Sequence, residues 1–286
     1  MSGKISGYLS LVKFSHTVFA LPFALIGFFL ALHFNAVLFS WQLFAKVLLC
    51  MVFARTAAMA FNRYVDREID KQNERTASRE IPAGTIKANM ALLLTVVSSL
   101  LFIITCWFIN PLCFYLSPVA LLVTLGYSYT KRFTSLSHLI LGLGLSLAPV
   151  GAYVAVTGKF HLLPIPLSIA VLTWVAGFDI IYALQDADFD RKQKLFSIPA
   201  LLGLRNALIV SSLLHALTFA CLLWEGIYAG FNGFYWAGFT IFSALLFYQH
   251  SIVKPADLSR VNLSFFTANG IASIVFCVFV LAELFF

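Results

Sequence analysis

Long runs of apolar residues, separated by short polar segments, dominate the chain. A helix needs about 20 such residues to cross the hydrocarbon core of a bilayer, and nine runs approach that length. Only Asn110 and Pro111, a turn signal, separate the third run from the fourth. The pattern predicts an all-α polytopic membrane protein with nine transmembrane helices. The runs lie at 15–33, 43–61, 89–109, 111–128, 137–156, 163–185, 206–228, 233–249 and 262–284.

The composition agrees with a membrane protein. Of the 286 residues, 61% are hydrophobic and only 11% are charged, whereas soluble domains carry about 25% charged residues. This excludes soluble enzymes, extracellular modules and disordered chains. The net charge of +7 could point to nucleic acid, but membrane orientation explains where the basic residues lie. We therefore expect the lipid bilayer as a partner and no nucleic acid.

The basic residues predict the orientation, because cytoplasmic loops hold an excess of Lys and Arg. Sixteen of the 19 fall in the N-terminal tail and in the loops after the second, fourth, sixth and eighth runs. Lys159 is on the opposite side, and Lys46 and Arg55 lie inside the second run. We expect an inner-membrane protein with a cytoplasmic N-terminus and an external C-terminus.

Acidic residues gather in two segments that hold nine of the 12 Asp and Glu. One follows the second run and the other ends the sixth run, four helices later. This spacing predicts one domain, 1–286, made of two four-helix halves, about 1–130 and 131–250, and a ninth helix. The acids are Asp66, Glu68, Asp70, Glu74 and Glu80 in the first segment and Asp179, Asp186, Asp188 and Asp190 in the second.

The spacing of these acids predicts two carboxylate stripes, each along one helix face. Asn62, Asp66 and Asp70 follow one another at intervals of four residues, so they drift only about 40° per step. Asp179, Asp186 and Asp190 form a similar series. Two carboxylates ~5 Å apart repel by about 3 kcal/mol at an effective dielectric of ~20, so a cation is favoured there. Oxygen ligands without nearby His or Cys favour Mg²⁺.

The alternative is that these acids are solvated loop charges paired with Arg63, Arg67 and Lys71. Two matching stripes on the same side of the membrane favour metal binding instead. Four basic residues near the stripes are candidates for binding phosphate oxygens, as Arg does in bidentate fashion. The positive-inside bias is the competing explanation for each. They are Arg75, Arg79, Lys131 and Lys192.

Two segments resemble the signatures of the UbiA superfamily of intramembrane prenyltransferases. The first runs from Asn62 to Asp70 as NxxxDxxxD, and RTxxRxxPxG follows it from Arg75 to Gly84. The second runs from Asp179 to Lys192 and is similar to DxxYxxxDxxxDxK. With the segment 127–132 and the nine runs, the resemblance covers nearly the whole chain.

The resemblance implies a nine-helix bundle around a central cavity that the two acid-bearing loops cap on the cytoplasmic side. It implies Mg²⁺-dependent transfer of a polyprenyl group from polyprenyl diphosphate to an aromatic acid such as 4-hydroxybenzoate, in respiratory quinone biosynthesis. Two Mg²⁺ ions would be held by Asn62, Asp66, Asp70, Asp186 and Asp190. Arg75, Arg79, Lys131 and Lys192 would bind the diphosphate. Asp179 and Tyr182 would lie at the acceptor end and orient the phenol or remove a proton.

The residues at the start of the first run do not determine which aromatic acid is the acceptor. Lys13, His16 and Pro22 stand where many 4-hydroxybenzoate enzymes have Arg-x-x-Lys-Pro-x-Gly. The opening is similar to a branch that also includes menaquinone-pathway enzymes acting on 1,4-dihydroxy-6-naphthoate. Lys13 and His16 are candidates for binding the acceptor carboxylate, although His16 also suits an interfacial histidine.

An ion-coupled secondary transporter is the alternative class. A transporter should place its acids near the bilayer midplane. All acids of the two segments except Asp179 instead fall at helix exits on one side, which favours the enzyme.

Overall fold

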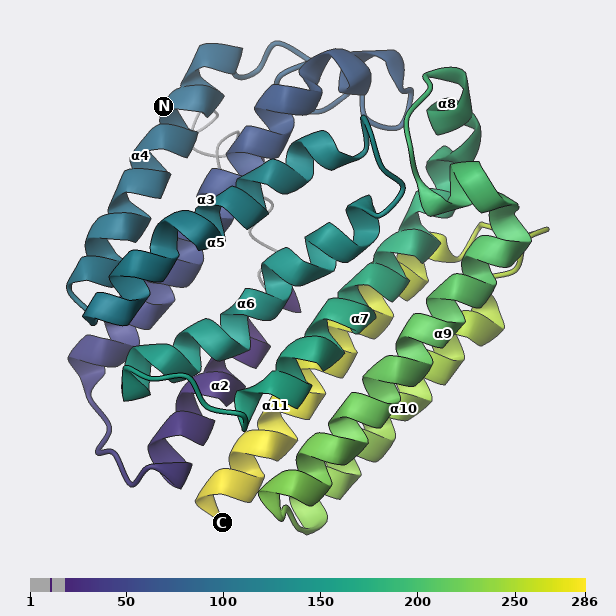
Figure 1. Ribbon diagram of the computed structural model, residues 1–286. Coiled ribbons are helices and arrows are strands. Elements are labelled where there is room, and N and C mark those ends of the chain that lie inside the picture. The colour runs from purple at the N-terminus through teal and green to yellow at the C-terminus, as the bar shows by residue number, and fades with distance from the viewer. Residues whose placement is uncertain (1–10, 12–18) are drawn as a thin grey trace. The chain divides into compact units, whose positions relative to one another are not determined.

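The computed structural model describes Leu11 and residues 19–286, and within this part of the chain the regular structure is helical (Figure 1). Lys13 and His16 lie outside the described residues. A 3₁₀ turn, Leu184–Asp186, precedes α8, and a π-helix, Leu263–Ala268, precedes α11. The helices are α2 (Leu21–Phe34), α3 (Trp41–Gln72), α4 (Ala88–Trp107), α5 (Pro111–Thr130), α6 (Ser137–Thr157), α7 (Pro164–Ala183), α8 (Ala187–Lys192), α9 (Ile198–Ala229), α10 (Gly233–Ile252) and α11 (Asn269–Phe285).

Each predicted apolar run has its helix, so the all-α prediction is confirmed for the described residues. The break at Asn110 is also confirmed, because α4 ends at Trp107 and the Asn110 side chain accepts a 2.8 Å hydrogen bond from Cys113 N in the first turn of α5. Seven of the described helical segments are long and apolar enough to span a bilayer. Among the rest, α2 has only 14 residues and α10 is not one of the seven, so nine crossings stay a prediction.

By their contacts the residues form two compact units, and the first comprises Ser40–Tyr129 with Leu11. It contains α3, α4 and nearly all of α5. The Ser40 hydroxyl caps α3 by accepting from Leu43 N at 3.4 Å. Helix α3 has 32 residues and is about 48 Å long, whereas a hydrocarbon core is about 30 Å thick. Its last turns therefore extend beyond the apolar segment, and they carry Asp66 and Asp70.

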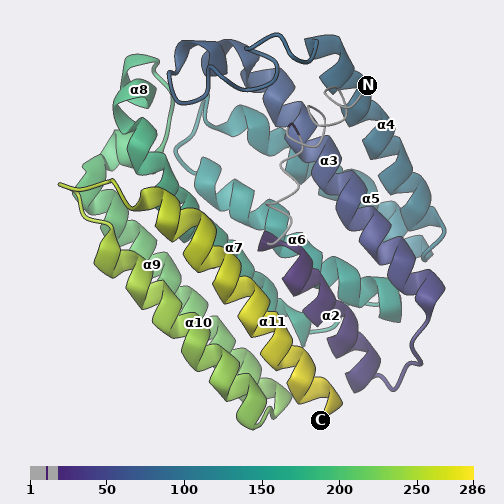
Figure 2. The ribbon, with the colours of Figure 1, turned by 180° about the vertical axis from the view of Figure 1, so that it is seen from behind.

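The second unit comprises residues 19–39 and Thr130–Phe286, and α7 is its central helix. Helix α6 packs between α2 and α7, while α11 packs against α2 and α10 (Figures 1 and 2). Trp174 of α7 is fully buried, and its indole Nε1 donates to Asn269 Oδ1 of α11 at 2.9 Å. Gly142 lets α6 approach α7 closely, since a Cβ there would collide with the Leu172 carbonyl.

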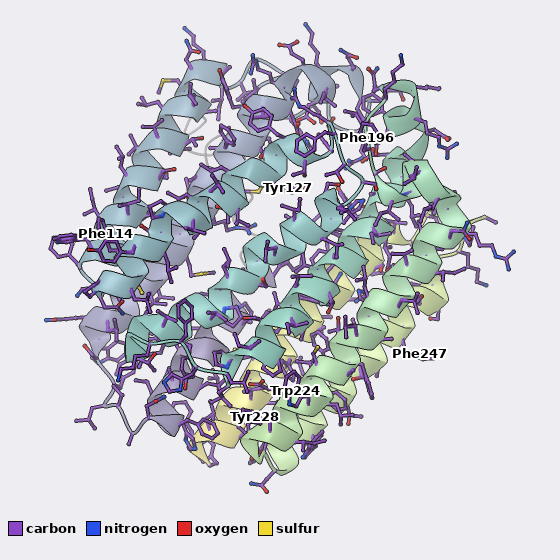
Figure 3. The ribbon with its side chains drawn as sticks, in the orientation of Figure 1. Phe114, Tyr127, Phe196, Trp224, Tyr228 and Phe247 are labelled. Atoms are coloured by element: carbon purple, nitrogen blue, oxygen red, sulfur yellow. The ribbon has the colours of Figure 1, made fainter. Side chains whose placement is uncertain are left out.

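The outer faces of the second unit are apolar. Trp224 and Tyr228 project from α9 and Phe247 projects from α10 (Figure 3). Phe247 is 83% exposed, which water would disfavour and lipid would not. Together with the seven candidate spans, these faces identify an integral membrane protein.

Candidate active site

The first acidic cluster lies on the last turns of α3. Asn62 Nδ2 donates to Asp66 Oδ2 at 3.1 Å, so the two side chains lie on one face. Asp66 is 2% exposed and Asp70 is 3% exposed. The two carboxylates are therefore buried and not solvated as the alternative interpretation expects, although Arg63, which it names as a partner, interacts electrostatically with both.

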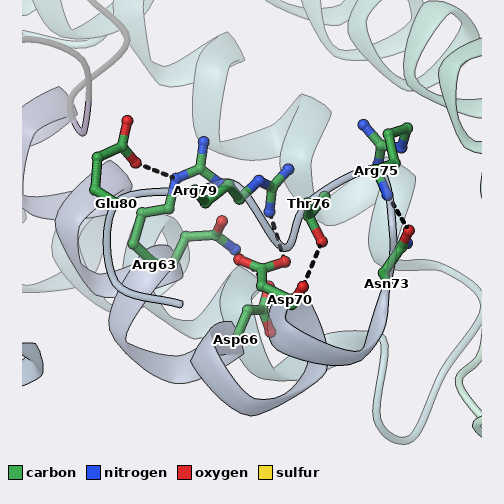
Figure 4. A network of polar contacts seen from close by, with 9 residues as sticks. Arg63, Asp66, Asp70, Asn73, Arg75, Thr76, Arg79 and Glu80 are labelled. Carbon is green, nitrogen blue, oxygen red and sulfur yellow. Dashed lines mark hydrogen bonds and ion pairs between the residues drawn. The ribbon is translucent and has the colours of Figure 1, made fainter. Parts of the chain in front are cut away.

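The loop after α3 folds back onto the same helix end (Figure 4). The Thr76 hydroxyl donates to the carbonyl of Asp70 at 3.0 Å, and Arg79 N donates to the carbonyl of Thr76 at 3.0 Å. This brings the Arg79 guanidinium to Asp70, where Nη1 donates to Oδ1 at 2.7 Å. Arg75 is exposed, and its backbone N–H donates to Asn73 Oδ1. The Arg-Thr-x-x-Arg spacing thus places one arginine on the cluster and the other at the surface of this unit.

Two further residues of this network were not predicted as site residues. Arg63 is 4% exposed, and its Nε lies 3.9 Å from Oε2 of Glu80 in the folded-back loop. Arg67 pairs with Glu68 at 3.6 Å and donates to the carbonyl of Tyr64 at 2.7 Å. These contacts connect both arginines to acids outside the predicted carboxylate stripe.

The first cluster fits a divalent cation. Oδ1 of Asp70 accepts from Arg79, but Oδ2 is buried and has no hydrogen-bond donor. A buried carboxylate oxygen without a donor is costly, and a cation would relieve that cost. Among the described residues no group of three or more His, Cys, Asp or Glu could hold a metal ion. Mg²⁺ uses one or two carboxylates with waters and substrate phosphates, so this pair of acids beside Asn62 is sufficient.

The second acidic cluster lies at the end of α7, within the second unit. Asp179 and Tyr182 belong to the last turns of α7, Asp186 ends the 3₁₀ turn, and Asp190 lies in α8. The helix that carries these acids is interrupted by a 3₁₀ turn at Leu184–Asp186, which changes their angular spacing, so their common face stays a prediction. Asp190 lies within electrostatic reach of Asp186.

Lys131 lies near this cluster and Lys192 on its surface. Lys131 is within electrostatic reach of Asp190, and its carbonyl accepts from Phe196 N at 2.7 Å in the loop before α9. Lys192 is exposed at the end of α8. The Tyr182 ring stacks on Phe265 with centroids 4.1 Å apart. The second unit therefore gathers Lys131 and Lys192, which are predicted to bind phosphate, near the predicted catalytic residues Asp179 and Tyr182.

Sequence reasoning missed His138, which lies in the first turn of α6. Its Nδ1 is 2.7 Å from Oδ2 of Asp179, and the histidine is 4% exposed. The two residues are 41 positions apart, and a lone histidine at the start of an apolar run carries no signal of such a contact.

The sequence is similar to a family of known proteins. Residues 20–271 match the model of the UbiA prenyltransferase family. A relative from Tolumonas auensis named 4-hydroxybenzoate octaprenyltransferase is 31% identical over 228 residues, which cover 80% of this chain and 79% of the relative.

Solved structures support the same family. The apo structure of a UbiA homolog from Aeropyrum pernix K1 is similar with a TM-score of 0.85 and 32% identity, and the match covers 94% of this chain and 98% of the homolog. A UbiA homolog from Archaeoglobus fulgidus bound to DMAPP and Mg²⁺ has the same fold, with a TM-score of 0.75 and 22% identity over 97% of this chain and 98% of that one.

Proposed function

Because the chain belongs to the UbiA prenyltransferase family, we propose that it transfers the polyprenyl group of a polyprenyl diphosphate to 4-hydroxybenzoate in ubiquinone biosynthesis. The observation that carries the acceptor is the match over four fifths of the chain to a relative named 4-hydroxybenzoate octaprenyltransferase. Family membership also decides against the transporter alternative.

In this proposal the two acidic clusters act in one reaction. Asn62, Asp66 and Asp70 of the first unit and Asp186 and Asp190 of the second would hold two Mg²⁺ ions. A metal held there would supply positive charge to stabilise the leaving diphosphate. The donor-free Oδ2 of Asp70 and the Mg²⁺-bound homolog from Archaeoglobus fulgidus support this assignment.

Basic side chains bind the diphosphate in the proposed reaction. Arg79 holds Oδ1 of Asp70 and so fixes the orientation of that carboxylate. Its remaining N–H groups, with Arg75, Lys131 and Lys192, donate to phosphate oxygens. These contacts stabilise the diphosphate as the allylic C–O bond breaks.

Asp179 and Tyr182 act at the acceptor. The ring carbon ortho to the hydroxyl attacks the allylic carbocation, a C–C bond forms, and the ring then loses the proton from that carbon. Asp179 orients the phenol or accepts this proton, since its carboxylate keeps 18% of its surface exposed. Tyr182, whose ring stacks on the buried Phe265, would stabilise a nearby cation through its π-system.

The chain lies in the cytoplasmic membrane as a single domain, with two four-helix halves and a ninth helix, and its active site faces the cytoplasm. The loop distribution of basic residues supports a cytoplasmic N-terminus and an external C-terminus. A reporter fused after Phe286 should then lie outside, and one inserted within 72–87 should lie inside. Opposite locations for both reporters would mean that the whole topology is inverted, and an inside location for the C-terminal reporter alone would mean that a crossing is miscounted.

The second candidate acceptor is 1,4-dihydroxy-6-naphthoate of menaquinone synthesis. The opening of the first run around Lys13 and His16 supports it, because it departs from the pattern of many 4-hydroxybenzoate enzymes. The test offers both acceptors in equal amounts to the purified protein with labelled polyprenyl diphosphate and Mg²⁺. We expect prenylated 4-hydroxybenzoate by mass spectrometry, and prenylation of the naphthoate alone would overturn the proposed acceptor.

A further inference from the structure

His138 connects α6, α7 and α9 near the second acidic cluster, within the second unit. It lies in the first turn of α6, its Nδ1 is 2.7 Å from Oδ2 of Asp179 on α7, and its Nε2 is 3.4 Å from Ile198 N at the start of α9. Both contacts lie within one unit of the structure. The imidazole therefore bridges a backbone amide and a carboxylate of the proposed acceptor end.

The contact with Ile198 determines which ring nitrogen of His138 carries the proton. A backbone N–H can only donate, so Nε2 must accept and cannot be protonated. The remaining proton of the neutral imidazole is then on Nδ1, which donates to Asp179 Oδ2. The same pairing holds the ring in one orientation, because both nitrogens are engaged.

The Ile198 amide is available because it begins a helix. The first N–H groups of a helix have no partner within it. The Ser197 hydroxyl accepts from Ala200 N at 3.3 Å, which satisfies one of these groups at the start of α9. Ile198 is 7% exposed, so its amide also needs an acceptor from the protein, and His138 provides it.

Exposure separates the roles of the two side chains. The His138 side chain is 5% exposed, whereas that of Asp179 is 18% exposed. A reactant can reach the carboxylate more readily than the imidazole. His138 also holds only Oδ2, so Oδ1 remains available to the acceptor.

We infer that His138 is a positioning residue that orients the Asp179 carboxylate toward the aromatic acceptor through a tautomer fixed by the Ile198 amide. This rests on the proposed function, in which Asp179 acts at the acceptor. The loop that leads into α9 also contacts Lys131. Phe196, two residues before Ile198, donates its backbone N–H to the carbonyl of Lys131. His138 thus connects the acceptor carboxylate to the segment that carries a diphosphate-binding lysine.

The test is a double-mutant cycle that combines His138→Ala and Asp179→Ala. For each variant, kcat and the KM for each substrate are measured. In the wild-type background His138→Ala should lower kcat by roughly 10- to 150-fold, the size expected for one hydrogen bond to a charged group, with KM for the prenyl diphosphate unchanged. In the Asp179→Ala background the same change should cost nothing more, because there is no carboxylate left to orient.

A conservative variant separates positioning from a purely structural role. His138→Asn keeps an N–H donor near the position of Nδ1 and loses the acceptor at Nε2, so it should recover most of the lost kcat. His161→Asn, at an exposed position, is the control and should match wild type. Thermal unfolding in detergent is measured for each variant, and His138→Asn carries the test if His138→Ala does not fold.

Equal losses of kcat from His138→Ala in both backgrounds would overturn the inference. So would a His138→Asn variant that is folded but as slow as His138→Ala. Failure of the proposed function is distinguishable, since it is seen in the wild-type protein as absence of transfer to 4-hydroxybenzoate. The cycle is then measured with whichever acceptor of the pair is prenylated.

Discussion

Arg79 Nη1 donates a 2.7 Å hydrogen bond to Oδ1 of Asp70, while Oδ2 of the same carboxylate is buried without a donor (Figure 4). The arginine reaches the acid because the loop after α3 folds back and the Thr76 hydroxyl donates to the Asp70 carbonyl. Oδ1 is thus held by Arg79, which the sequence predicts to bind phosphate, and Oδ2 is suited to bind a metal ion. The helix end and the loop that follows it therefore meet at the Asp70 side chain.

Asp70→Asn tests the metal-binding role of the first cluster. The amide keeps the shape of the side chain but loses its charge, so kcat should fall by roughly 100- to 1,000-fold, as when one group stabilising transition-state charge is removed. Labelled product is measured at saturating Mg²⁺. Glu68→Gln is the matched control, since Glu68 is an acid of the same helix with a 74% exposed side chain. A near-normal rate for Asp70→Asn would remove Asp70 from the metal site.

Arg79→Lys tests the geometry of the anion contact. Lysine keeps the charge but has no planar fork to bind a carboxylate and a phosphate together. We expect KM for the prenyl diphosphate to rise about tenfold or more, the effect of losing one charge-assisted hydrogen bond, while KM for the acceptor stays constant. Steady-state kinetics with each substrate varied in turn give both constants. An equal rise in both would argue against a specific diphosphate contact.

The first cluster could be predicted from sequence because its residues lie on one continuous helix, where spacing alone determines which side chains share a face. The second could be predicted only in part. Its residues were found by their signature, but the 3₁₀ turn at Leu184–Asp186 interrupts the regular spacing. The contact of His138 with Asp179 depends on how α6 packs against α7, which neither segment encodes by itself.

Helix ends show the same limit. The predicted run at 206–228 misses the first turns of α9, which begins at Ile198. Gly203 has φ of 78°, outside the helical region, and Arg205 interrupts the apolar pattern there. An apolar run counted from the sequence therefore begins several residues after the true start of the helix, although Ser197 and Pro199 are typical of a helix N-terminus. The burial of Asp66 and Asp70 was likewise not evident, because acids at a helix exit usually lie in water.

Gly142→Ala tests the close packing of α6 against α7. The new Cβ would collide with the Leu172 carbonyl, so the helices must separate, at a cost of about 1–3 kcal/mol in the free energy of unfolding. Thermal unfolding in detergent should show a lower midpoint. Gly151→Ala on the same helix is the control, because a Cβ there has nothing within 4 Å, and its midpoint should equal or exceed that of wild type, since Ala favours a helix over Gly. Equal midpoints for both variants would mean that the close approach adds no stability.

Replacing Lys13 and His16 together with Ala tests the acceptor end. If they bind the acceptor carboxylate, the loss of a charge-assisted hydrogen bond should raise KM for the acceptor at least roughly tenfold and leave donor affinity unchanged. Titration of 4-hydroxybenzoate at saturating donor measures this. Unchanged acceptor kinetics would return His16 to the role of an interfacial histidine and direct attention to Arg55 or Arg132.

The most direct measurement of the central claim is metal removal and restoration in the prenyl transfer reaction itself. The purified protein is incubated with labelled polyprenyl diphosphate and 4-hydroxybenzoate, first in EDTA and then with Mg²⁺ added back, and the product is identified by mass. We expect no product in EDTA and full return of prenylated 4-hydroxybenzoate with Mg²⁺, with one diphosphate released for each product. Transfer that proceeds in EDTA, or no transfer at any Mg²⁺ concentration, would contradict the account.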